Sequence, residues 1–284
     1  MRILIELTGG LGNQFFGYAF GYALSRRLGA ELWLDTSMQD NGRVRELELL
    51  NYDVKYDKRI TYAYSSGLLN RSVVNKIRRR RLIGWHTHIY KEKEAMVYDE
   101  LVNKISSDTY FKGFWQNQKY FLEYREDLLK MLQPKGKRSE SVYEAVEAVS
   151  RTNSVAVHIR RGDYVSIGCD LKMEYYDKAL ELMNQKAEKG FEVFVFSDDI
   201  KFCKNFLSKY AGKINIIYPE YESDNRTMDD LLIMSRCKHI IMANSSYSWW
   251  AAWLNRNAEK IVICPQTGIW GENFYLEDWI KITA

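Results

Sequence analysis

Apolar and polar positions alternate in blocks along the chain, and the first block predicts a strand, a helix and a strand. Residues 3–7 form a short apolar run, which is typical of a buried parallel strand. A glycine-rich turn follows, and the spacing of apolar residues then predicts a helix over 15–28 with Gly29 as its C-terminal cap. Residues 31–34 predict a second strand that ends at Asp35. This order of elements sets the fold class as α/β.

The second half of the chain repeats the alternation more clearly. Each apolar run is followed by polar residues and a helical pattern, as in a parallel sheet with Rossmann-like winding. A helix is expected at about 139–150. The predicted strands are 154–159, 191–196, 239–243 and 260–264, the last ended by Pro265, with a weaker strand at 214–217.

The middle of the chain gives a weaker pattern, which does not define the topology of residues 40–130. We expect helices at 67–81 and 118–132 and a short strand near 108–114. The chain turns polar over 134–141, so we place an interdomain link there. This gives an N-terminal domain at 1–138 and a C-terminal domain at 139–284, leaving open whether the last residues pack back on the N-terminal domain. Two Rossmann-like domains facing each other across a cleft are the expected architecture.

The composition narrows the class of protein. The 284 residues exceed the usual size of one core, and the 46% hydrophobic and 27% charged residues are ordinary for a globular protein. The net charge of +4 is too small to predict nucleic-acid binding. The four cysteines are widely spaced and form no CxxC pair, so neither a zinc site nor a redox dithiol is indicated. We expect buried thiols in a reducing compartment.

The location of the protein is also constrained by its apolar runs. The N-terminal run is too short for a signal peptide and is interrupted by Glu6, and no stretch reaches the roughly 18 apolar residues of a membrane span. We therefore expect a cytoplasmic protein. The basic run from Arg78 to Arg81 would suit peripheral contact with the inner membrane surface or a polyanionic glycan, although a solvated helix face is the commoner origin of such a run.

The residues that follow each predicted strand are the candidates for chemistry, because ligands of open parallel sheets collect beyond the carboxyl ends of the strands. After the strand at 154–159, alternation places His158 and Arg160 on one face and Arg161 on the other. Gly162 permits a tight turn, and Asp163 can hold one arginine in place. A guanidinium fixed in this way suits a diphosphate. A structural ion pair is the alternative, which the flanking glycine and carboxylate disfavour.

A second candidate follows the strand at 191–196. Ser197 and Asp198 at a strand end suit hydrogen bonds to a base or a ribose, while capping of the next helix by these residues or Asp199 explains the pattern about as well. The segment is not a DxD motif, so the metal-binding carboxylate pattern of another large transferase class is missing. Asp229 and Asp230 fit a helix start better than a ligand site.

The third candidate is the hydroxyl-rich turn Asn244–Tyr247, which leads into a predicted helix. Free backbone amides and the hydroxyls of Ser245 and Ser246 gather at the positive end of the helix dipole, which is a phosphate site in physical terms. The tryptophans that follow have helical spacing and are expected to pack in the core rather than on a sugar. They are Trp249, Trp250 and Trp253.

The fourth candidate is the N-terminal glycine-rich turn. Gly12 follows a strand at the position of a dinucleotide fingerprint, with Asp35 at the end of the next strand, but Phe15 replaces the third glycine. Asn13 and Gln14 stand at a helix start, from which they could instead reach across a cleft to the sugar or diphosphate.

Taken in order, these four segments resemble the bacterial α-1,2-fucosyltransferases, glycosyltransferase family eleven, and more distantly the α-1,6- and protein O-fucosyltransferases. The resemblance spans nearly the whole chain, and the arginine motif is its most specific part. It rests on the motifs GGLGNQ at 9–14, HIRRGDY at 158–164, FSDD at 196–199 and NSSYSWWAAWL at 244–254.

The resemblance implies a GT-B fold, GDP-β-L-fucose as the donor, and transfer with inversion and without a metal or other cofactor. It implies an acceptor-side N-terminal domain carrying Asn13 and a C-terminal domain that binds the GDP-sugar. Arg160 would neutralise the leaving GDP, with Arg161 and Asp163 maintaining the motif. Ser245, Ser246 and Tyr247 would lie near the phosphates, and Asp198 near the guanosine.

The expected reaction is therefore transfer of L-fucose to the 2-hydroxyl of a β-galactoside in an oligosaccharide or a lipid-linked glycan. The general base is not evident: His158, Asp163, Glu6 and Asp35 are candidates by position, and a late proton transfer assisted by the donor phosphate needs none of them. Three alternatives remain open. They are a transferase for another GDP-sugar, a nicotinamide-dependent oxidoreductase and a non-catalytic glycan-binding protein.

Overall fold

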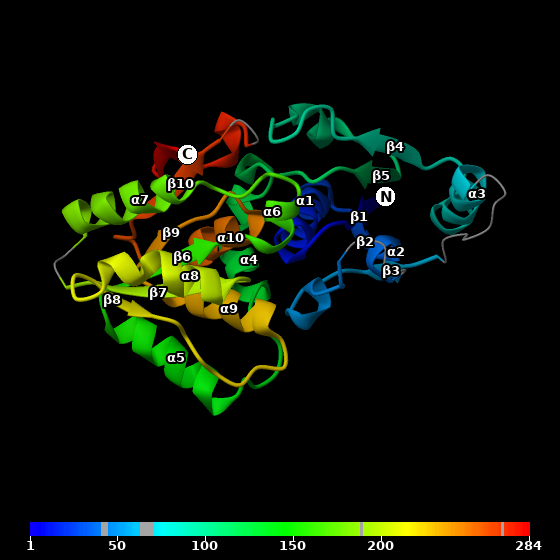
Figure 1. Ribbon diagram of the computed structural model, residues 1–284. Coiled ribbons are helices and arrows are strands. Elements are labelled where there is room, and N and C mark those ends of the chain that lie inside the picture. The colour runs from blue at the N-terminus through cyan, green and yellow to red at the C-terminus, as the bar shows by residue number, and fades with distance from the viewer. Residues whose placement is uncertain (41–44, 63–70, 188–189, 268–269) are drawn as a thin grey trace. The chain divides into compact units, whose positions relative to one another are not determined.

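The structure of the protein is a computed structural model, and it describes residues 1–40, 45–62, 71–187, 190–267 and 270–284. The chain forms two compact units, Met1–Lys135 and Gly136–Ala284. Each unit is built on one parallel sheet with helices on its faces (Figure 1). No helix among the described residues has both the length and the apolar character needed to cross a bilayer.

The first unit contains a five-stranded sheet in the order β3-β2-β1-β5-β4, in which every pairing is parallel. Its strands are β1 (Arg2–Glu6), β2 (Glu31–Asp35), β3 (Lys58–Ile60), β4 (His88–Lys91) and β5 (Thr109–Lys112). Its helices are α1 (Leu11–Leu28), α2 (Ser37–Asp40), α3 (Arg71–Ile83) and α4 (Arg125–Met131), with 3-10 turns at Leu49–Asn51, Glu100–Lys104, Gln118–Tyr120 and Leu122–Tyr124.

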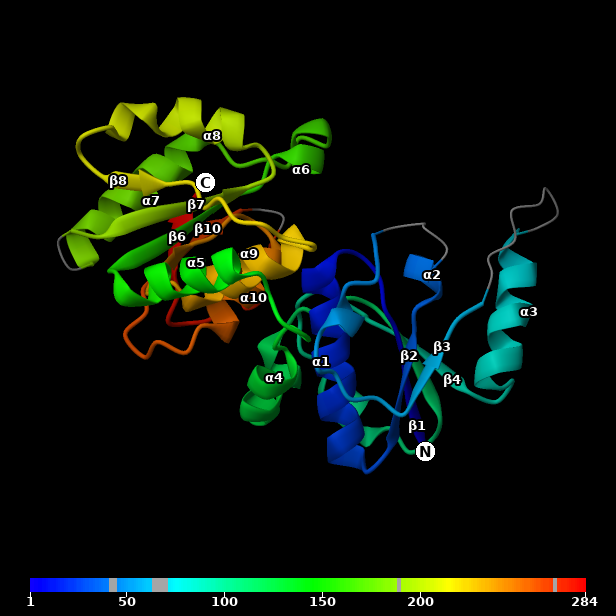
Figure 2. The same ribbon diagram turned by 90° about the horizontal axis from the view of Figure 1, so that it is seen from below.

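Two helices sandwich this sheet (Figure 2). Helix α1 lies close against β1, since a Cβ atom added at Gly21 would stand 2.5 Å from Cγ1 of Ile5. On the other face, Ile83 of α3 packs in a cluster with Leu4 and Tyr110. Even-numbered residues of β1 therefore face α3 and odd-numbered residues face α1.

The second unit contains a six-stranded parallel sheet in the order β11-β10-β9-β6-β7-β8. Its strands are β6 (Ser154–Ile159), β7 (Glu192–Ser197), β8 (Asn215–Ile217), β9 (His239–Ile241), β10 (Val262–Gln266) and β11 (Ile280–Thr283). Its helices are α5 (Glu140–Arg151), α6 (Gly162–Ser166), α7 (Met173–Lys186), α8 (Ile200–Leu207), α9 (Arg226–Arg236) and α10 (Ser246–Leu254), with 3-10 turns at Ser208–Tyr210 and Glu272–Phe274.

The helices of the second unit cover both faces of its sheet, α7 and α8 on one face and α5, α9 and α10 on the other (Figure 2). Val155, Val157 and Ile159 pack in a core cluster with residues of α7 and α8. Counted along the chain from β6, the strand order is the Rossmann order, with β6 to β8 on one side and β9 to β11 on the other. The α/β class with two Rossmann-like sheets is therefore confirmed.

Several predicted elements need correction. Helix α1 begins at Leu11 rather than Phe15, so the expected turn is already the first helical turn. The predicted helix over 118–132 is two 3-10 turns followed by α4, and strands β3, β4 and β11 were not predicted. The start of the helix expected over 67–81 lies outside the described residues, since 63–70 are not described.

Two smaller predictions also differ from the structure. Strand β10 runs through Pro265 instead of ending before it. It pairs with β9 only at Val262 and Ile263, so Pro265 lies where one side of the strand is already an edge, which proline tolerates. Of the four cysteines expected to be buried, Cys169 is half-exposed and the other three are buried.

Candidate active site

The carboxyl edge of the second sheet brings three of the four predicted segments to neighbouring strands. The chain turns to opposite sides of the sheet after β6 and after β9, which are hydrogen-bonded neighbours, and ligands of such sheets bind at this switch point. Arg160 follows β6 directly, and the turn from Asn244 to Ser245 follows β9. Ser197 ends β7, on the other side of β6.

Two carboxylates hold the guanidinium of Arg160. Its Nη2 donates to Oδ1 of Asp163 at 2.6 Å, and its Nη1 lies 2.8 Å from Oδ2 of Asp198. The side chain is one quarter exposed, so it is held in place while its remaining N–H donors stay within reach of a ligand. The predicted pairing of Asp163 with an arginine is present, and Asp198 adds a second partner.

Asp198 also fixes the turn that carries the arginines. Its Oδ1 accepts hydrogen bonds from the backbone N–H groups of Arg161 at 2.9 Å and Gly162 at 3.2 Å. A Cβ atom at Gly162 would stand only 2.6 Å from Oδ2 of Asp198. The turn therefore needs a glycine because Asp198 approaches so closely at the start of the short helix α6. Asp198 therefore holds both Arg160 and the backbone of the turn in place. Its expected position near the guanosine rests on the resemblance alone.

Arg161 has a different set of partners, as alternation along β6 predicts. Its Nη1 lies 3.3 Å from Asp170 and its Nε 3.3 Å from Asp199. Its guanidinium stands 3.5 Å from the ring centroid of Phe202 on α8. A cation fixed by two acids and a ring is well suited to hold the motif in place. Asp170 and Phe202 were not identified from the sequence.

The FSDD segment supports the capping interpretation for two of its residues. Asp199 is the N-cap of α8 and accepts a hydrogen bond from the backbone N–H of Phe202 at 3.1 Å. The hydroxyl of Ser197 accepts from the N–H of Asp199 at 3.0 Å. Of this segment, Asp198 alone contacts Arg160.

Helix α10 directs its N-terminus at the switch point. Ser245 is its N-cap and accepts from the N–H of Tyr247 at 3.2 Å, so the first amides of the helix stand where a phosphate would be favoured. Ser246 is half-buried, and the Tyr247 hydroxyl donates to the carbonyl of Thr227. Asn244 is 1% exposed and donates to the Cys169 carbonyl at 2.7 Å.

The side-chain oxygen of Asn244 has no hydrogen-bond partner among the described residues. A buried acceptor left without a donor is costly. At the switch point, this makes Asn244 a candidate to accept a hydrogen bond from a bound ligand.

His158 lies inside the sheet rather than at the edge. It is 5% exposed, and its ring centroid stands 5.5 Å from that of Tyr247 on α10. Burial, with a further contribution from the charge of Arg160, lowers the pKa of His158 from 6.5 to about 3. An imidazole with so low a pKa is a weak proton acceptor, so this geometry disfavours His158 as a general base.

In the first unit, the side chain of Asn13 packs directly against the backbone of the glycine-rich segment. Gly9 has φ of +76°, and a Cβ atom there would stand 2.5 Å from Nδ2 of Asn13. Oδ1 of Asn13 accepts from Gln116 at 2.9 Å. Gly12 is buried within the first turn of α1.

Gln14 is fully buried and uses both ends of its amide on backbone groups. It donates to the carbonyls of Gly9 at 3.0 Å and Glu46 at 2.7 Å. Its oxygen accepts from the N–H groups of Glu48 and Leu49 at 3.0 Å each. The described contacts of Gln14 therefore hold the loop before the first 3-10 turn to the glycine-rich segment.

A second polar cluster lies at the carboxyl edge of the first sheet, on the face covered by α3. The Tyr110 hydroxyl contacts Glu6 at 2.9 Å and Asp35 at 2.6 Å, and Lys112 pairs with Glu6 at 2.9 Å. Asp35 is 1% exposed, and burial raises its pKa, while hydrogen bonds from Ser37 and Tyr110 partly offset the rise. Lys112 ends the strand predicted near 108–114, so applying the strand-end rule there would have found it, whereas Tyr110 lies within the strand.

The buried tryptophans and the acidic, histidine and cysteine residues of the described chain show what the site does not contain. Trp249, Trp250 and Trp253 are buried, so the expected core packing is confirmed. No group of three or more His, Cys, Asp or Glu in the described part of the chain is placed to hold a metal ion.

A cavity of about 560 Å³ lies at the opposite, amino edge of the second sheet, beside residues such as Arg236 and Asn257, away from the arginine turn.

Comparison with known proteins matches this chain over nearly its whole length. The family model described as "Glycosyl transferase family 11" matches residues 3–283. An α-1,2-colitosyltransferase of Escherichia coli is 32% identical over 299 residues, covering 99% of this chain and 98% of the relative. The O-antigen biosynthesis glycosyltransferase WbnK of Escherichia coli is 29% identical, covering 97% of this chain and 99% of the relative.

Solved structures show the same fold at low sequence identity. The Escherichia coli ADP-heptose LPS heptosyltransferase II matches with a TM-score of 0.51 at 12% identity, covering 99% of this chain and 90% of that one. At this identity the match concerns the fold alone, which is the GT-B fold expected from the resemblance.

Proposed function

This chain belongs to glycosyl transferase family 11, and from that premise we propose that it transfers L-fucose from GDP-β-L-fucose to the 2-hydroxyl of a β-galactoside. The reaction inverts the anomeric centre and needs no metal ion or other cofactor. The observation that carries the proposal is Arg160, a guanidinium clamped by two aspartates at the switch point beside the N-terminus of α10.

The chemistry asks the protein mainly to stabilise the leaving group. The bond from the anomeric carbon to the β-phosphate oxygen breaks with its electron pair on GDP, while the acceptor oxygen forms the new bond and loses its proton. Arg160 donates to the diphosphate, and the first amides of α10 add the positive end of a helix dipole. Ser245 and Ser246 stand at that helix start, and Asn244 offers its buried oxygen to a hydroxyl or N–H of the nucleotide.

The other predicted residues take supporting places in this proposal. Asp163 and Asp198 orient Arg160, with Asp198 also bordering the nucleoside, and Arg161 holds the turn through Asp170 and Asp199. Tyr247 and Ser197 maintain the strand ends that border the diphosphate.

In the first unit, the glycine-rich segment belongs to the acceptor side. Gly12 and Asn13 lie in the first turn of α1, whose amides and side chains face the carboxyl edge of that sheet. Gln14 acts through the loop that it holds. The acceptor is a galactose-terminated oligosaccharide or lipid-linked glycan.

Among the four residues considered for the general base, Glu6 is the best placed. His158 is buried with a low pKa, Asp163 is already assigned to orienting Arg160 on the donor side, and Asp35 is enclosed by Ser37 and Tyr110, whereas Glu6, although paired with Lys112, belongs to the acceptor-side unit. The Glu6 side chain ends β1 and is partly exposed, at 14%. We therefore propose that Glu6 accepts the proton from the acceptor hydroxyl, and that Lys112 and Tyr110 fix the orientation of the Glu6 carboxylate.

The second candidate donor is GDP-colitose, because a full-length relative is an α-1,2-colitosyltransferase. Colitose is 3-deoxy-L-fucose, so the two donors differ by one hydroxyl. A site that hydrogen-bonds this hydroxyl would reject the deoxy sugar by about 10⁴-fold, whereas a site without such a bond would accept both. Initial rates with equal concentrations of the two donors decide between them.

The experiment that tests the proposed function measures product formation from GDP-fucose and a β-galactoside by mass spectrometry, with the linkage determined by NMR. Arg160→Ala should lower turnover at least about 100-fold, and Arg160→Lys should fail as well because forked donation to the diphosphate is lost. Arg151→Ala, which removes an exposed arginine of the same unit, is the matched control. Near-normal turnover of Arg160→Ala, or a rate that EDTA abolishes, would contradict the proposal.

A further inference from the structure

Positive charge is concentrated in one segment of the first unit. Residues 58–91 contain nine Lys or Arg and no Asp or Glu, while the whole chain has a net charge of +4. The rest of the chain is therefore net negative. An asymmetry of this kind points to an anionic partner for the segment.

Helix α3, within this segment, carries an exposed apolar stripe between cations. Val73 and Ile77 are one turn apart and are 46% and 37% exposed. At 100° per residue, Lys76 lies on one side of the stripe and Arg81 on the other. Both cations are exposed, and neither has a hydrogen bond or ion pair to a described residue.

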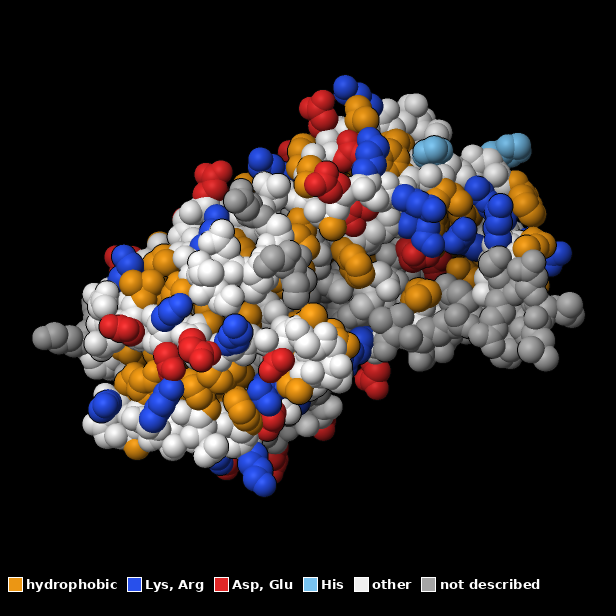
Figure 3. Space-filling model, turned by 45° about the horizontal axis from the view of Figure 1, so that its top comes forward, with side chains coloured by type: hydrophobic (Ala, Val, Ile, Leu, Met, Phe, Trp, Pro, Cys, Tyr) orange, Lys and Arg blue, Asp and Glu red, His pale blue; other side chains and the backbone are white. Residues whose placement is uncertain are grey.

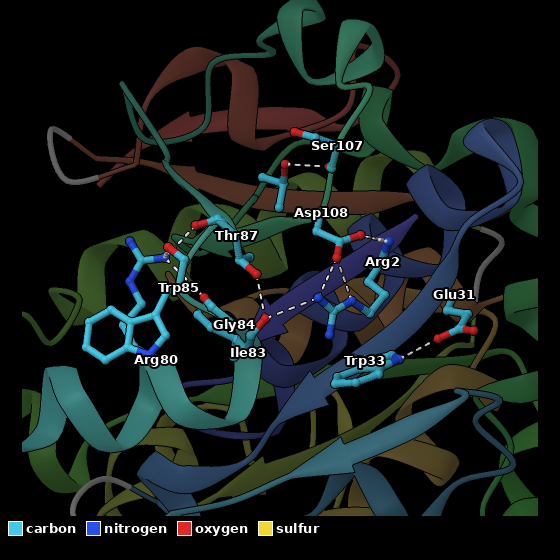
Figure 4. A network of polar contacts seen from close by, with 11 residues as sticks. Arg2, Glu31, Trp33, Arg80, Ile83, Gly84, Trp85, Thr87, Ser107 and Asp108 are labelled. Atoms are coloured by element: carbon cyan, nitrogen blue, oxygen red, sulfur yellow. Dashed lines mark hydrogen bonds and ion pairs between the residues drawn. The ribbon is translucent and has the colours of Figure 1, made fainter.

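Trp85 is 61% exposed and lies just beyond the C-terminal end of α3, four residues after Arg81. Hydrogen bonds hold the loop that carries Trp85. Nη1 of Arg80 donates to the carbonyls of Trp85 at 3.2 Å and Thr87 at 2.5 Å, and the Thr87 hydroxyl donates to the carbonyl of Ile83 (Figure 4). An exposed indole on a tethered loop is held ready for a contact rather than left over from the core.

The same loop is tied to the amino edge of the sheet. Nη2 of Arg2 donates to the Ile83 carbonyl at 3.3 Å, and the guanidinium pairs with Asp108 (Figure 4). Strands β1 and β5 begin at this edge, whereas the glycine-rich segment and the cluster around Glu6 lie at the carboxyl edge. The exposed surface is therefore separate from the residues assigned to the reaction.

We propose that the surface formed by Val73, Lys76, Ile77, Arg81 and Trp85 docks the protein on an anionic lipid bilayer. Figure 3 shows Lys, Arg and His side chains gathered beside hydrophobic ones at the end of the first unit that carries α3. Each basic side chain near the bilayer surface strengthens the attraction of the protein to acidic headgroups. Tryptophan is enriched at the level of the headgroups in membrane proteins.

The apolar members of the surface decide the kind of partner. A solvated helix face would gain nothing from three exposed apolar side chains, and an acidic glycan would use the cations alone. A bilayer takes both, because the apolar stripe enters the boundary below the headgroups while the flanking cations stay at the phosphates. With a stripe this small, the attachment is reversible and salt-dependent.

The test is flotation with vesicles of phosphatidylethanolamine and phosphatidylglycerol, compared with pure phosphatidylcholine. The wild-type chain should float with the anionic vesicles alone. Arg81→Glu should weaken the partition constant about 30-fold, since two units of charge are changed. Trp85→Ala should weaken it about tenfold through the lost apolar contact.

Two controls match these substitutions elsewhere on the surface. Lys213→Glu makes the same charge change at an exposed residue of the second unit, and Leu122→Ala removes a side chain that is 46% exposed. Both should float like the wild type, and Arg81→Glu and Trp85→Ala should keep normal activity on a water-soluble acceptor. Equal binding to phosphatidylcholine, or an equal loss in Lys213→Glu, would overturn the proposal. So would tight binding to a soluble acidic polysaccharide together with unchanged flotation of Trp85→Ala.

Discussion

Replacing His158 by phenylalanine should remove a large part of the chain's sensitivity to acid. The imidazole is 5% exposed, and its Nδ1 has no hydrogen-bond partner among the described residues. Its pKa is lowered from 6.5 to about 3, first by burial and then by the charge of Arg160. The native chain therefore keeps this ring neutral at pH values where the unfolded chain protonates it.

The sign and size of the effect follow from this difference in proton binding. Between pH 6.5 and about 3 the unfolded state binds the extra proton, so the free energy of unfolding falls as the pH falls. Each pH unit below 6.5 costs about 1.4 kcal/mol, which amounts to about 3 kcal/mol at pH 4. Phenylalanine fills a similar volume and has no proton to gain, so this contribution disappears in His158→Phe.

The assay is urea unfolding of both proteins at pH 7, 6, 5 and 4, followed by tryptophan fluorescence. The difference in free energy of unfolding should move in favour of His158→Phe by about 3 kcal/mol between pH 7 and pH 4. His88→Gln, which removes an exposed histidine, should follow the wild type. Parallel curves for His158→Phe and the wild type would refute the reasoning. Loss of turnover by more than about 100-fold in a folded His158→Phe protein would restore this residue as the base.

Three further substitutions test close packing at two glycines and buried hydrogen bonding at Gln14. Gly21→Ala should destabilise the chain by up to about 2 kcal/mol in thermal unfolding, because the contact with Ile5 outweighs the helix propensity gained. Gly162→Ala should lower turnover at least tenfold with a small change in stability, since the new methyl group displaces Asp198; an unchanged kcat would show that the turn can move. Gln14→Ala should cost at least about 2 kcal/mol in urea unfolding, because four backbone groups lose their partner.

The sequence predicted most of the strands but fewer of the helix starts. The apolar runs of β1, β6 and β7 are enclosed on both faces, which makes them continuous and easy to recognise, and β2 keeps buried leucines although Glu31 is exposed. Strands β3, β4 and β11 lie at sheet edges or are half-exposed, and their composition is mixed. Helix α1 was expected four residues too late, because its first turn is rich in glycine and polar residues and its N-cap Gly10 makes no side-chain hydrogen bond.

For the candidate site, the sequence identified positions better than partners. The strand-end rule located Arg160 and Ser245 correctly at neighbouring strands. It did not show that Asp198, 38 residues after Arg160, reaches back to hold that arginine, because the pairing exists only once β6 and β7 lie side by side. Nor did it separate His158 from the edge residues, since burial depends on the packing of α10 over the sheet.

The parallel sheet also explains how one unit can carry two separate surfaces. All strands of the first unit run the same way, so residues that follow them, such as Glu6 and Lys112, collect at the carboxyl edge. The loops that enter the strands collect at the other edge, and there Arg2 ties the loop of Trp85 to the start of β1. A five-residue strand separates the two edges by roughly 16 Å, at about 3.3 Å per residue. Substitutions at Trp85 therefore test the proposed membrane attachment without moving the residues that we assign to the acceptor side.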